Sequence, residues 1–192
     1  MVVQVDLDSL LKRVGALLED GPYVLGSGRV SPYYFDSKEL TLDPDGQFVV
    51  ANYFLEKLKL STAQAVGGMA DSAIPIVSAI VAESRIQGHP LPGFFVRKEA
   101  KAHGTEKLIE GKVPLDRSCP VAIIDDVVTG GRSILKAIDA IEDLGNPISD
   151  VMCILDRREG GGDELKARGY DLRSMFTVEL TAKGVVELEF NP

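Results

Sequence analysis

Val121-Ala-Ile-Ile-Asp-Asp-Val-Val-Thr-Gly-Gly-Arg-Ser133 is the stretch that decides how this chain is expected to fold. It opens with four apolar residues, which is typical of a strand buried on both faces of a sheet. Asp125 and Asp126 follow, and the pair is expected to emerge together at the end of the strand. A turn with two glycines then leads into a helical pattern, so the stretch predicts a strand, a turn and a helix in succession.

The same alternation continues on both sides of this stretch. Short apolar runs predict strands at 65–69, 94–96, 121–124, 151–155 and 172–180. Helical patterns predict helices at 73–83, 133–144 and 163–168, and the tail 185–190 alternates like a further strand. Because strands that alternate with helices connect through right-handed crossovers, we expect a doubly wound α/β fold with a mainly parallel sheet.

The N-terminal part of the chain has a different pattern. Apolar residues recur at helical spacing from Leu7 to Leu18 behind Asp6, and Gly21-Pro22 is expected to end that helix. Extended segments are expected at 23–25 and 33–35. Asp43-Pro44 predicts the cap and the first residue of another helix. We therefore expect one domain, 1–192, with a small N-terminal hood (1–63) on an α/β core (64–180).

Composition excludes several classes of protein. The 192 residues include 21 Lys+Arg and 29 Asp+Glu, a net charge of −8, so nucleic acid is not expected as a partner. No apolar stretch is long enough to predict a membrane span, and no signal segment is recognised at the N-terminus. The two cysteines and two histidines lack the spacing of a zinc site or a disulfide framework. A cytoplasmic protein is expected.

The turn after the acidic pair has the chemistry of a phosphate site. Gly130 and Gly131 let backbone N–H groups converge with a helix N-terminus on an anion, and Thr129 and Ser133 add hydroxyl donors. Ionised carboxylates only accept hydrogen bonds, so the pair indicates a ligand that also carries hydroxyls, such as a ribose 5-phosphate. Neither a P-loop nor a dinucleotide fingerprint is present. For the carboxylates taken alone, an ordinary strand–turn–helix is the alternative.

Residues 123–133 resemble the phosphoribosyl-pyrophosphate signature of the type I phosphoribosyltransferases. Arg97-Lys-Glu-Ala-Lys-Ala-His-Gly-Thr-Glu-Lys-Leu-Ile-Glu-Gly111 resembles the mobile catalytic loop of orotate phosphoribosyltransferases, although most such charge runs are solvated loops. Residues 97–112 hold five basic and three acidic side chains, a local charge of +2. Cations that close over a departing pyrophosphate stabilise the transition state. The residues expected to grip it are Arg97, Lys98, Lys101 and His103.

Two further segments are similar to the same family. In Leu25-Gly-Ser-Gly-Arg-Val-Ser-Pro-Tyr-Tyr-Phe-Asp36, the resemblance implies that Tyr34 and Phe35 flank the flat pyrimidine. Without the resemblance, these aromatic residues are expected in the core. After the strand at 151–155, the resemblance implies that Arg157 meets the orotate carboxylate, for which the guanidinium fork is well suited.

The resemblance covers about residues 21–161 and implies a reaction. Phosphoribosyl pyrophosphate and orotate would give orotidine 5′-monophosphate and pyrophosphate, by displacement at the anomeric carbon through an oxocarbenium-like state in pyrimidine biosynthesis. Asp125 and Asp126 would hold the ribose hydroxyls. The 5-phosphate would be held by Thr129, Gly130, Gly131, Arg132 and Ser133. Mg²⁺ would be bound chiefly by the substrate's own oxygens, without a dedicated protein site. A homodimer that shares the 97–111 loop is also implied.

Other functions are compatible with parts of this pattern. Some relatives carry lysines at Gly26 and near Ser72, so a phosphoribosyltransferase for another base is one alternative. A non-catalytic regulator that senses phosphoribosyl pyrophosphate would keep the glycine turn but would not need Lys101 and His103. A phosphate-binding signalling domain would use the acidic pair for Mg²⁺, and the two glycines would then be unexplained.

Overall fold

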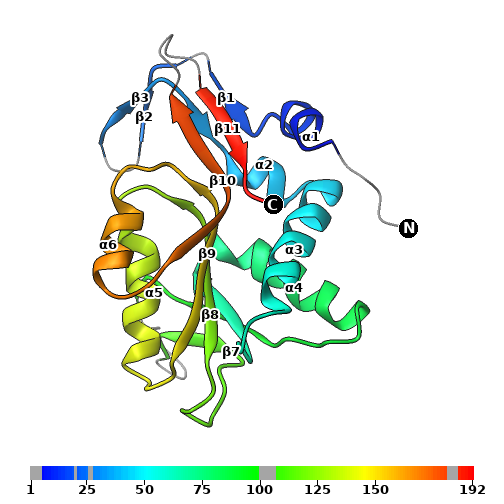
Figure 1. The fold of residues 1–192 in the computed structure, drawn as a ribbon, viewed down its shortest axis with the longest axis vertical. Coiled ribbons are helices and arrows are strands. Elements are labelled where there is room, and N and C mark those ends of the chain that lie inside the picture. Colours follow the sequence, from blue (N-terminus) through cyan, green and yellow to red (C-terminus); the bar gives the residue numbers. More distant parts are fainter. Residues whose placement is uncertain (1–5, 20, 26–27, 100–106, 181–185) are drawn as a thin grey trace.

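The computed structural model describes residues 6–19, 21–25, 28–99, 107–180 and 186–192. At its centre lies a seven-stranded sheet with the order β11-β10-β9-β8-β5-β6-β7 (Figure 1). Its strands are β5 (Val66–Met69), β6 (Gly93–Val96), β7 (Ile109–Gly111), β8 (Val121–Val128), β9 (Ile148–Asp156), β10 (Leu172–Leu180) and β11 (Val186–Phe190). The central strands pair in parallel, and the edge strands β7 and β11 pair antiparallel. The predicted mainly parallel α/β fold is confirmed.

Helices cover both faces of the sheet. On one face lie α3 (Pro44–Leu58) and α4 (Ala73–Ile86), and on the other lie α5 (Arg132–Glu142) and α6 (Gly161–Ala167) (Figure 1). The central strand β8 contributes to both layers, because Ala122 and Ile124 join the core with α3 and α4 whereas Val121 and Ile123 join the core with α5. All four side chains are fully buried. This explains why the strand is continuously apolar instead of alternating.

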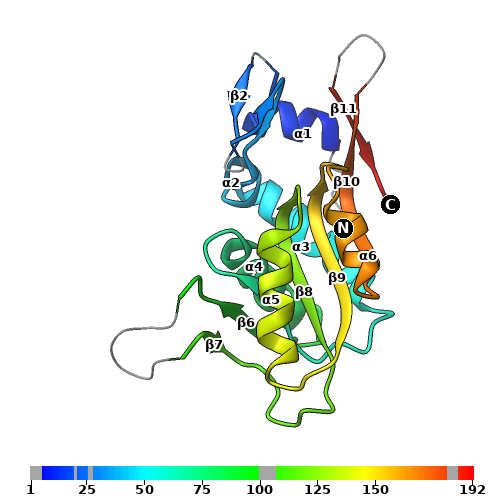
Figure 2. The ribbon, with the colours of Figure 1, turned by 90° about the vertical axis from the view of Figure 1, so that its left-hand side faces the viewer.

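The hood lies beyond the carboxyl ends of the parallel strands (Figure 2). Its elements are α1 (Leu7–Val14), β1 (Leu17–Leu18), β2 (Tyr23–Val24), β3 (Val30–Ser31), β4 (Tyr34–Phe35) and α2 (Ser37–Thr41). β1 pairs with β4 and β2 pairs with β3, both antiparallel. The prediction of one helix up to Leu18 is wrong. The helix ends at Gly15, where a φ of 68° places the backbone in the left-handed region that favours glycine, and the chain then continues as β1.

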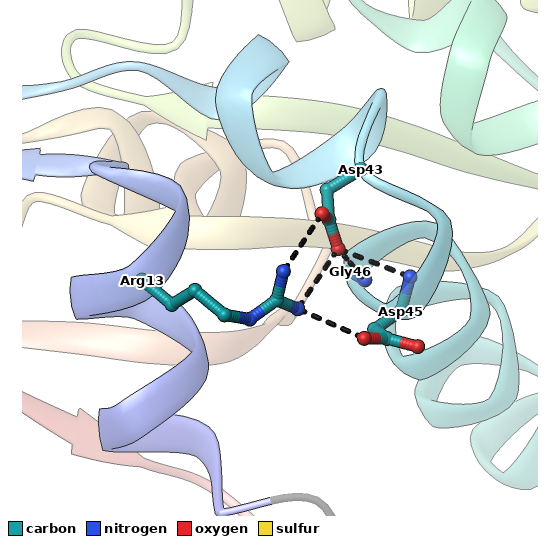
Figure 3. A network of polar contacts seen from close by, with 4 residues as sticks. All are labelled: Arg13, Asp43, Asp45 and Gly46. Carbon is teal, nitrogen blue, oxygen red and sulfur yellow. Dashed lines mark hydrogen bonds and ion pairs between the residues drawn. The ribbon is translucent and has the colours of Figure 1, made fainter.

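The start of α3 confirms the predicted cap and links the hood to the core. The Asp43 carboxylate accepts hydrogen bonds from the N–H groups of Asp45 at 3.0 Å and Gly46 at 2.9 Å. Arg13 of α1 reaches the same cap, with N···O distances of 3.1 Å to Asp43 and 2.9 Å to Asp45 (Figure 3). The Gly46 N–H and the Arg13 guanidinium lower the pKa of the Asp43 carboxyl. The first helix is thus attached to the helical layer on the sheet.

The layers of the structure do not follow the sequence division at residues 63 and 180. α3 precedes residue 63, yet it packs in the same core cluster as α4 and the sheet. β11 follows residue 180 and extends the sheet by pairing with β10. The predicted core strands and helices are all present, with bounds that differ by a few residues. The part of the N-terminal segment that covers the sheet end is therefore the run from α1 to α2.

Candidate active site

A cavity of about 430 Å³ lies between the hood and the carboxyl end of β8. Its walls come from β4 and α2 of the hood, the end of β8, the turn into α5 and the residue after β9. The predicted site residues that line it are Tyr34, Phe35, Asp125, Asp126, Thr129, Gly130, Gly131, Arg132, Ser133 and Arg157. Ligands of open α/β sheets bind at this place, beyond the carboxyl ends of the strands.

The acidic pair lies inside β8, and the prediction that it follows the strand is wrong. Pairing with β9 continues through Asp125 and on to Val128, so the strand is longer than its apolar run. Asp125 is 1% exposed and accepts hydrogen bonds from the hydroxyls of Ser72, at 2.8 Å, and Ser133. Asp126 is less buried and accepts a hydrogen bond of 2.5 Å from Ser37 of α2. The two carboxylates therefore have different surroundings.

Burial gives Asp125 unusual acid–base properties. Loss of hydration, followed by the negative charge of Asp126, raises the pKa of Asp125 to about 7. The hydrogen bonds from Ser133 and Ser72 oppose this rise, because they favour the ionised form. Perturbed carboxyl groups of this kind concentrate at functional sites. The pair can accept hydrogen bonds from ligand hydroxyls, and it changes its charge near neutral pH.

The glycine turn after β8 is packed tightly against the start of α6. Gly131 has a φ of 77° and precedes the first residue of α5, and Gly130 is exposed with no atom within 4 Å of the place of a Cβ. The Gly161 N–H donates to the Thr129 carbonyl at 2.8 Å. A Cβ on Gly161 would lie 2.6 Å from that same oxygen. The turn and the N-terminus of α5 therefore present backbone to the cavity, the arrangement that binds phosphate elsewhere.

The aromatic pair and Arg157 also line the cavity. Tyr34 is 37% exposed at the cavity, whereas Phe35 is 5% exposed and also belongs to the hydrophobic core. This difference follows from the alternation of β4, since successive strand residues point to opposite sides. Arg157 is 6% exposed, and its guanidinium lies 4.1 Å from the centre of the Tyr33 ring. An exposed aromatic ring and a buried cation thus line the same cavity.

The predicted basic loop begins at the same end of the sheet, but its described residues do not line the cavity. Arg97 follows β6 and lies 3.9 Å from Glu110, and Lys98 donates a hydrogen bond of 2.7 Å to Asp71. This contact lowers the pKa of the Asp71 carboxyl and raises the pKa of the Lys98 ammonium. Lys101 and His103 lie outside the described residues. Because β6 runs parallel to β5, the chain leaves it toward the cavity end.

Sequence reasoning missed several residues that complete the site. Ser37 and Ser72 bind the acidic pair, Gly161 supports the glycine turn, and Lys38 lines the cavity. Only Gly161 carried a local signal, because it follows Arg157 in a glycine pair after a predicted strand. Ser37, Ser72 and Lys38 reach the site through the fold of distant segments. Ser72 stands out in the sequence only as a position near which some relatives carry lysine, and its bond to the acidic pair could not be foreseen.

A mainly parallel sheet with a hood, an acidic pair and a glycine turn at the end of its central strand defines a phosphoribosyltransferase of type I. A scan against protein-family models finds no match. The orotate phosphoribosyltransferase of Aquifex aeolicus is 37% identical over 178 residues, which are 92% of this chain and 96% of that one. That of Nostoc sp. is 35% identical over 178 residues, 90% of this chain and 85% of that one. The chain belongs to the orotate phosphoribosyltransferase family.

Solved structures agree with this assignment. A crystal structure of Mycobacterium tuberculosis H37Rv orotate phosphoribosyltransferase superposes with a TM-score of 0.74 at 31% identity, covering 88% of this chain and 95% of that one. The same enzyme in complex with 5-phospho-α-D-ribosyl 1-diphosphate superposes with a TM-score of 0.69 at 28% identity, covering 88% and 92%.

Proposed function

We propose that this chain transfers the phosphoribosyl group from phosphoribosyl pyrophosphate to orotate. The products are orotidine 5′-monophosphate and pyrophosphate, in the biosynthesis of pyrimidines. The single observation that carries this function is the cavity, because one space of about 430 Å³ combines an acidic pair, a glycine turn at a helix N-terminus, an exposed tyrosine and a buried arginine. These groups match the hydroxyls, the phosphate, the flat ring and the carboxylate of the two substrates.

The sugar phosphate is held at the end of β8. Asp125 and Asp126 accept hydrogen bonds from the ribose hydroxyls, and their negative charge supports the cationic character that develops on the ribose ring. The 5-phosphate is bound by backbone N–H groups of 129–133 and by the Thr129 hydroxyl. The Ser133 hydroxyl donates to Asp125 in the structure, so its role is to hold that carboxylate as well as to line the phosphate site.

The base is held by Tyr34, Phe35 and Arg157. The ring of Tyr34 offers a face on which a planar pyrimidine stacks, and Phe35 lines the same cavity from the core. Arg157 donates two parallel hydrogen bonds to the orotate carboxylate. In this arrangement, the attacking ring nitrogen of the base faces the anomeric carbon from the side opposite to the departing pyrophosphate.

The basic loop acts on the leaving group. Arg97, Lys98, Lys101 and His103 bind pyrophosphate as the bond to the anomeric carbon breaks, when its negative charge grows. Lys98 exchanges its contact with the Asp71 carboxylate for one with the pyrophosphate. The loop reaches the site of the neighbouring subunit in a homodimer, which is the assembly that we propose for this chain.

The acidic pair also fits the cofactor that this chemistry requires. The described residues contain no cluster of three or more His, Cys, Asp or Glu side chains that could hold a metal ion. Mg²⁺ prefers oxygen ligands and usually takes only one or two protein carboxylates beside the phosphates of a substrate. Asp125 and Asp126 are the carboxylates that would contact it, directly or through water. When bound with the substrate, Mg²⁺ neutralises charge on the pyrophosphate.

We propose that the enzyme acts in the cytoplasm and binds neither nucleic acid nor membranes. Each helix in the described part of the chain is too short or too polar to serve as a membrane span. The net charge of −8 disfavours phosphate backbones as partners. The substrates are themselves polyanions, and the local groups at the cavity and the 97–111 loop bind them.

The test is a turnover assay with a panel of bases. The chain is incubated with phosphoribosyl pyrophosphate, Mg²⁺ and either orotate, uracil, adenine, guanine or hypoxanthine, and the loss of each base is followed. We expect loss of orotate with equal formation of orotidine 5′-monophosphate. Turnover of a purine without orotate would show a different specificity. Tight binding of phosphoribosyl pyrophosphate without any turnover would favour the regulator.

A further inference from the structure

Arg157 is surrounded by three side chains, those of Ser31, Tyr33 and Glu159, which have no direct part in the proposed reaction. Its side chain is 3% exposed, its Nε donates to Glu159 Oε1 at 2.9 Å, and its Nη2 donates to Ser31 Oγ at 2.9 Å. The Tyr33 ring covers one face of the guanidinium at 4.1 Å. Contacts along one edge and on one face leave a planar guanidinium little freedom to turn.

Ser31 is itself held in place by the backbone of the same turn. Its hydroxyl donates to the Tyr33 carbonyl at 2.6 Å and lies 3.3 Å from the Tyr33 N–H, which donates to it. With its own hydrogen committed to that carbonyl, the oxygen is left as an acceptor toward Arg157. Ser31 is 3% exposed, so the hydroxyl cannot be replaced by bulk water without rearrangement.

Glu159 links Arg157 to a second cation, Arg29. Glu159 bridges two cations, because its Oε2 lies 2.9 Å from Arg29 Nη1 while its Oε1 accepts from Arg157. A buried guanidinium without a counter-ion is costly, and Glu159 removes that cost. Arg29 then balances Glu159, so the three side chains carry a net charge of +1. One added carboxylate would neutralise this group of three side chains.

We propose that Ser31, Tyr33 and Glu159 are positioning residues that aim Arg157 at the carboxylate of the base. The Nε and Nη2 contacts occupy one side of the guanidinium, and Nη1 has no hydrogen-bond partner among the residues that the structure describes. Arg157 lines the cavity, so the edge formed by Nη1 and the second Nη2 hydrogen is available for a bidentate contact. This inference rests on the proposed function and deepens it. These residues set the discrimination of orotate from uracil, which lacks the carboxylate.

Two substitutions test the geometry and the charge separately. Ser31→Ala removes the acceptor for Nη2 without a change in charge, and Arg29→Gln removes the outer cation from an exposed position. We expect Ser31→Ala to raise the KM for orotate on the order of tenfold, because a hydrogen bond to a charged group is lost. Arg29→Gln should raise the KM for orotate by about threefold, because the ion pair that it removes is exposed and contributes little. In both variants kcat, the KM for phosphoribosyl pyrophosphate and the inhibition constant of uracil should stay within about twofold.

Matched controls come from the exposed side of α4. Ser78→Ala and Arg85→Gln make the same chemical changes at exposed residues outside the cavity and should leave every constant unchanged. Equal losses of affinity for orotate and uracil, or a lower melting temperature with an unchanged KM for orotate, would reduce Ser31 to a structural role and overturn the inference. Failure of the unaltered chain to convert orotate would overturn the proposed function, and the inference with it.

Discussion

Asp125→Asn is expected to change the way in which the free energy of unfolding depends on pH. In the folded chain, burial and then the charge of Asp126 raise the pKa of Asp125 from 3.8 to about 7. The folded state therefore binds a proton at Asp125 over a range of pH in which the unfolded state does not. The stabilisation from this proton is complete below pH 3.8 and is lost by about pH 7 as the pH rises. Asparagine does not titrate, so the variant lacks this loss.

The size of the effect follows from the pKa change. Each unit of pKa is worth about 1.4 kcal/mol, so the full range from 3.8 to about 7 corresponds to about 4 kcal/mol. About two pKa units lie between pH 5 and the folded pKa. The free energy of unfolding should therefore fall by about 3 kcal/mol from pH 5 to 8 through Asp125. The side chain is 1% exposed, so solvent does not screen it. The hydrogen bonds from Ser133 and Ser72 favour the ionised carboxylate, and their effect on the slope is already contained in the folded pKa of about 7. A loss of stability that does not depend on pH shifts the two curves apart by a constant.

The assay is urea unfolding of both proteins at several pH values from 5 to 8. Far-ultraviolet circular dichroism is the suitable signal, because the chain has no tryptophan. The stability of Asp125→Asn minus that of the unaltered chain should grow by about 3 kcal/mol from pH 5 to 8. Asp143→Asn, at an exposed residue after α5, serves as the control and should show no such trend. A difference that stays constant over this range would refute the burial of a titrating charge at Asp125.

Four further outcomes are expected from the same site. The acid limb of the pH profile of kcat/KM for phosphoribosyl pyrophosphate should lie near pH 7. Asp126→Asn should move this limb to lower pH, because it removes the negative charge beside Asp125. Identical pH profiles of the variant and the unaltered chain would contradict this coupling. Gly161→Ala places a Cβ 2.6 Å from a backbone oxygen of the glycine turn and should raise the KM for phosphoribosyl pyrophosphate on the order of tenfold. Gly162→Ala is the control, because the nearest atom to its added Cβ is 3.7 Å away, and it should leave this KM unchanged. Ser37→Ala removes the contact of α2 with the acidic pair and should lower kcat and the free energy of unfolding, the latter by about 1 kcal/mol in urea titrations. Lys101→Ala should lower kcat far more than it weakens orotate binding, and equal losses would count against a role on the leaving group.

Local physics explains why the core could be predicted from the sequence. β8 and β9 are buried on both faces, so their apolar runs stand out against the polar turns around them. Asp43-Pro44 marks the start of α3 because a side-chain acceptor and a fixed φ are needed within a few residues of each other. The glycine turn is equally local, since its function depends on its own backbone. Signals of this kind need no knowledge of the rest of the chain.

The features that sequence reasoning placed wrongly depend on distant partners. β8 runs through the acidic pair because β9 lies beside it, and hydrogen bonding to a neighbouring strand outweighs the low strand propensity of aspartate. The apolar pattern continues past Gly15 because Leu17 and Leu18 form strand β1 instead of a further helical turn; Leu17 packs against the core, whereas Leu18 is exposed. The Arg157 shell combines a residue of β3 with one that follows β9. Nothing within either segment indicates the other.

Serine hydroxyls from distant segments also shape the binding step that we propose. Asp125 accepts a hydrogen bond from Ser72, and Asp126 accepts one from Ser37. When the substrate binds, a ribose hydroxyl can take the place of either serine hydroxyl as the donor to the carboxylate. The carboxylate, which has little access to water, therefore has an O–H donor both before and after binding. A lysine near position 72 would instead place a positive charge beside Asp125 and hold it ionised at lower pH. The serine leaves burial as the dominant influence on this carboxyl group, and substrate binding should therefore depend on pH near neutrality.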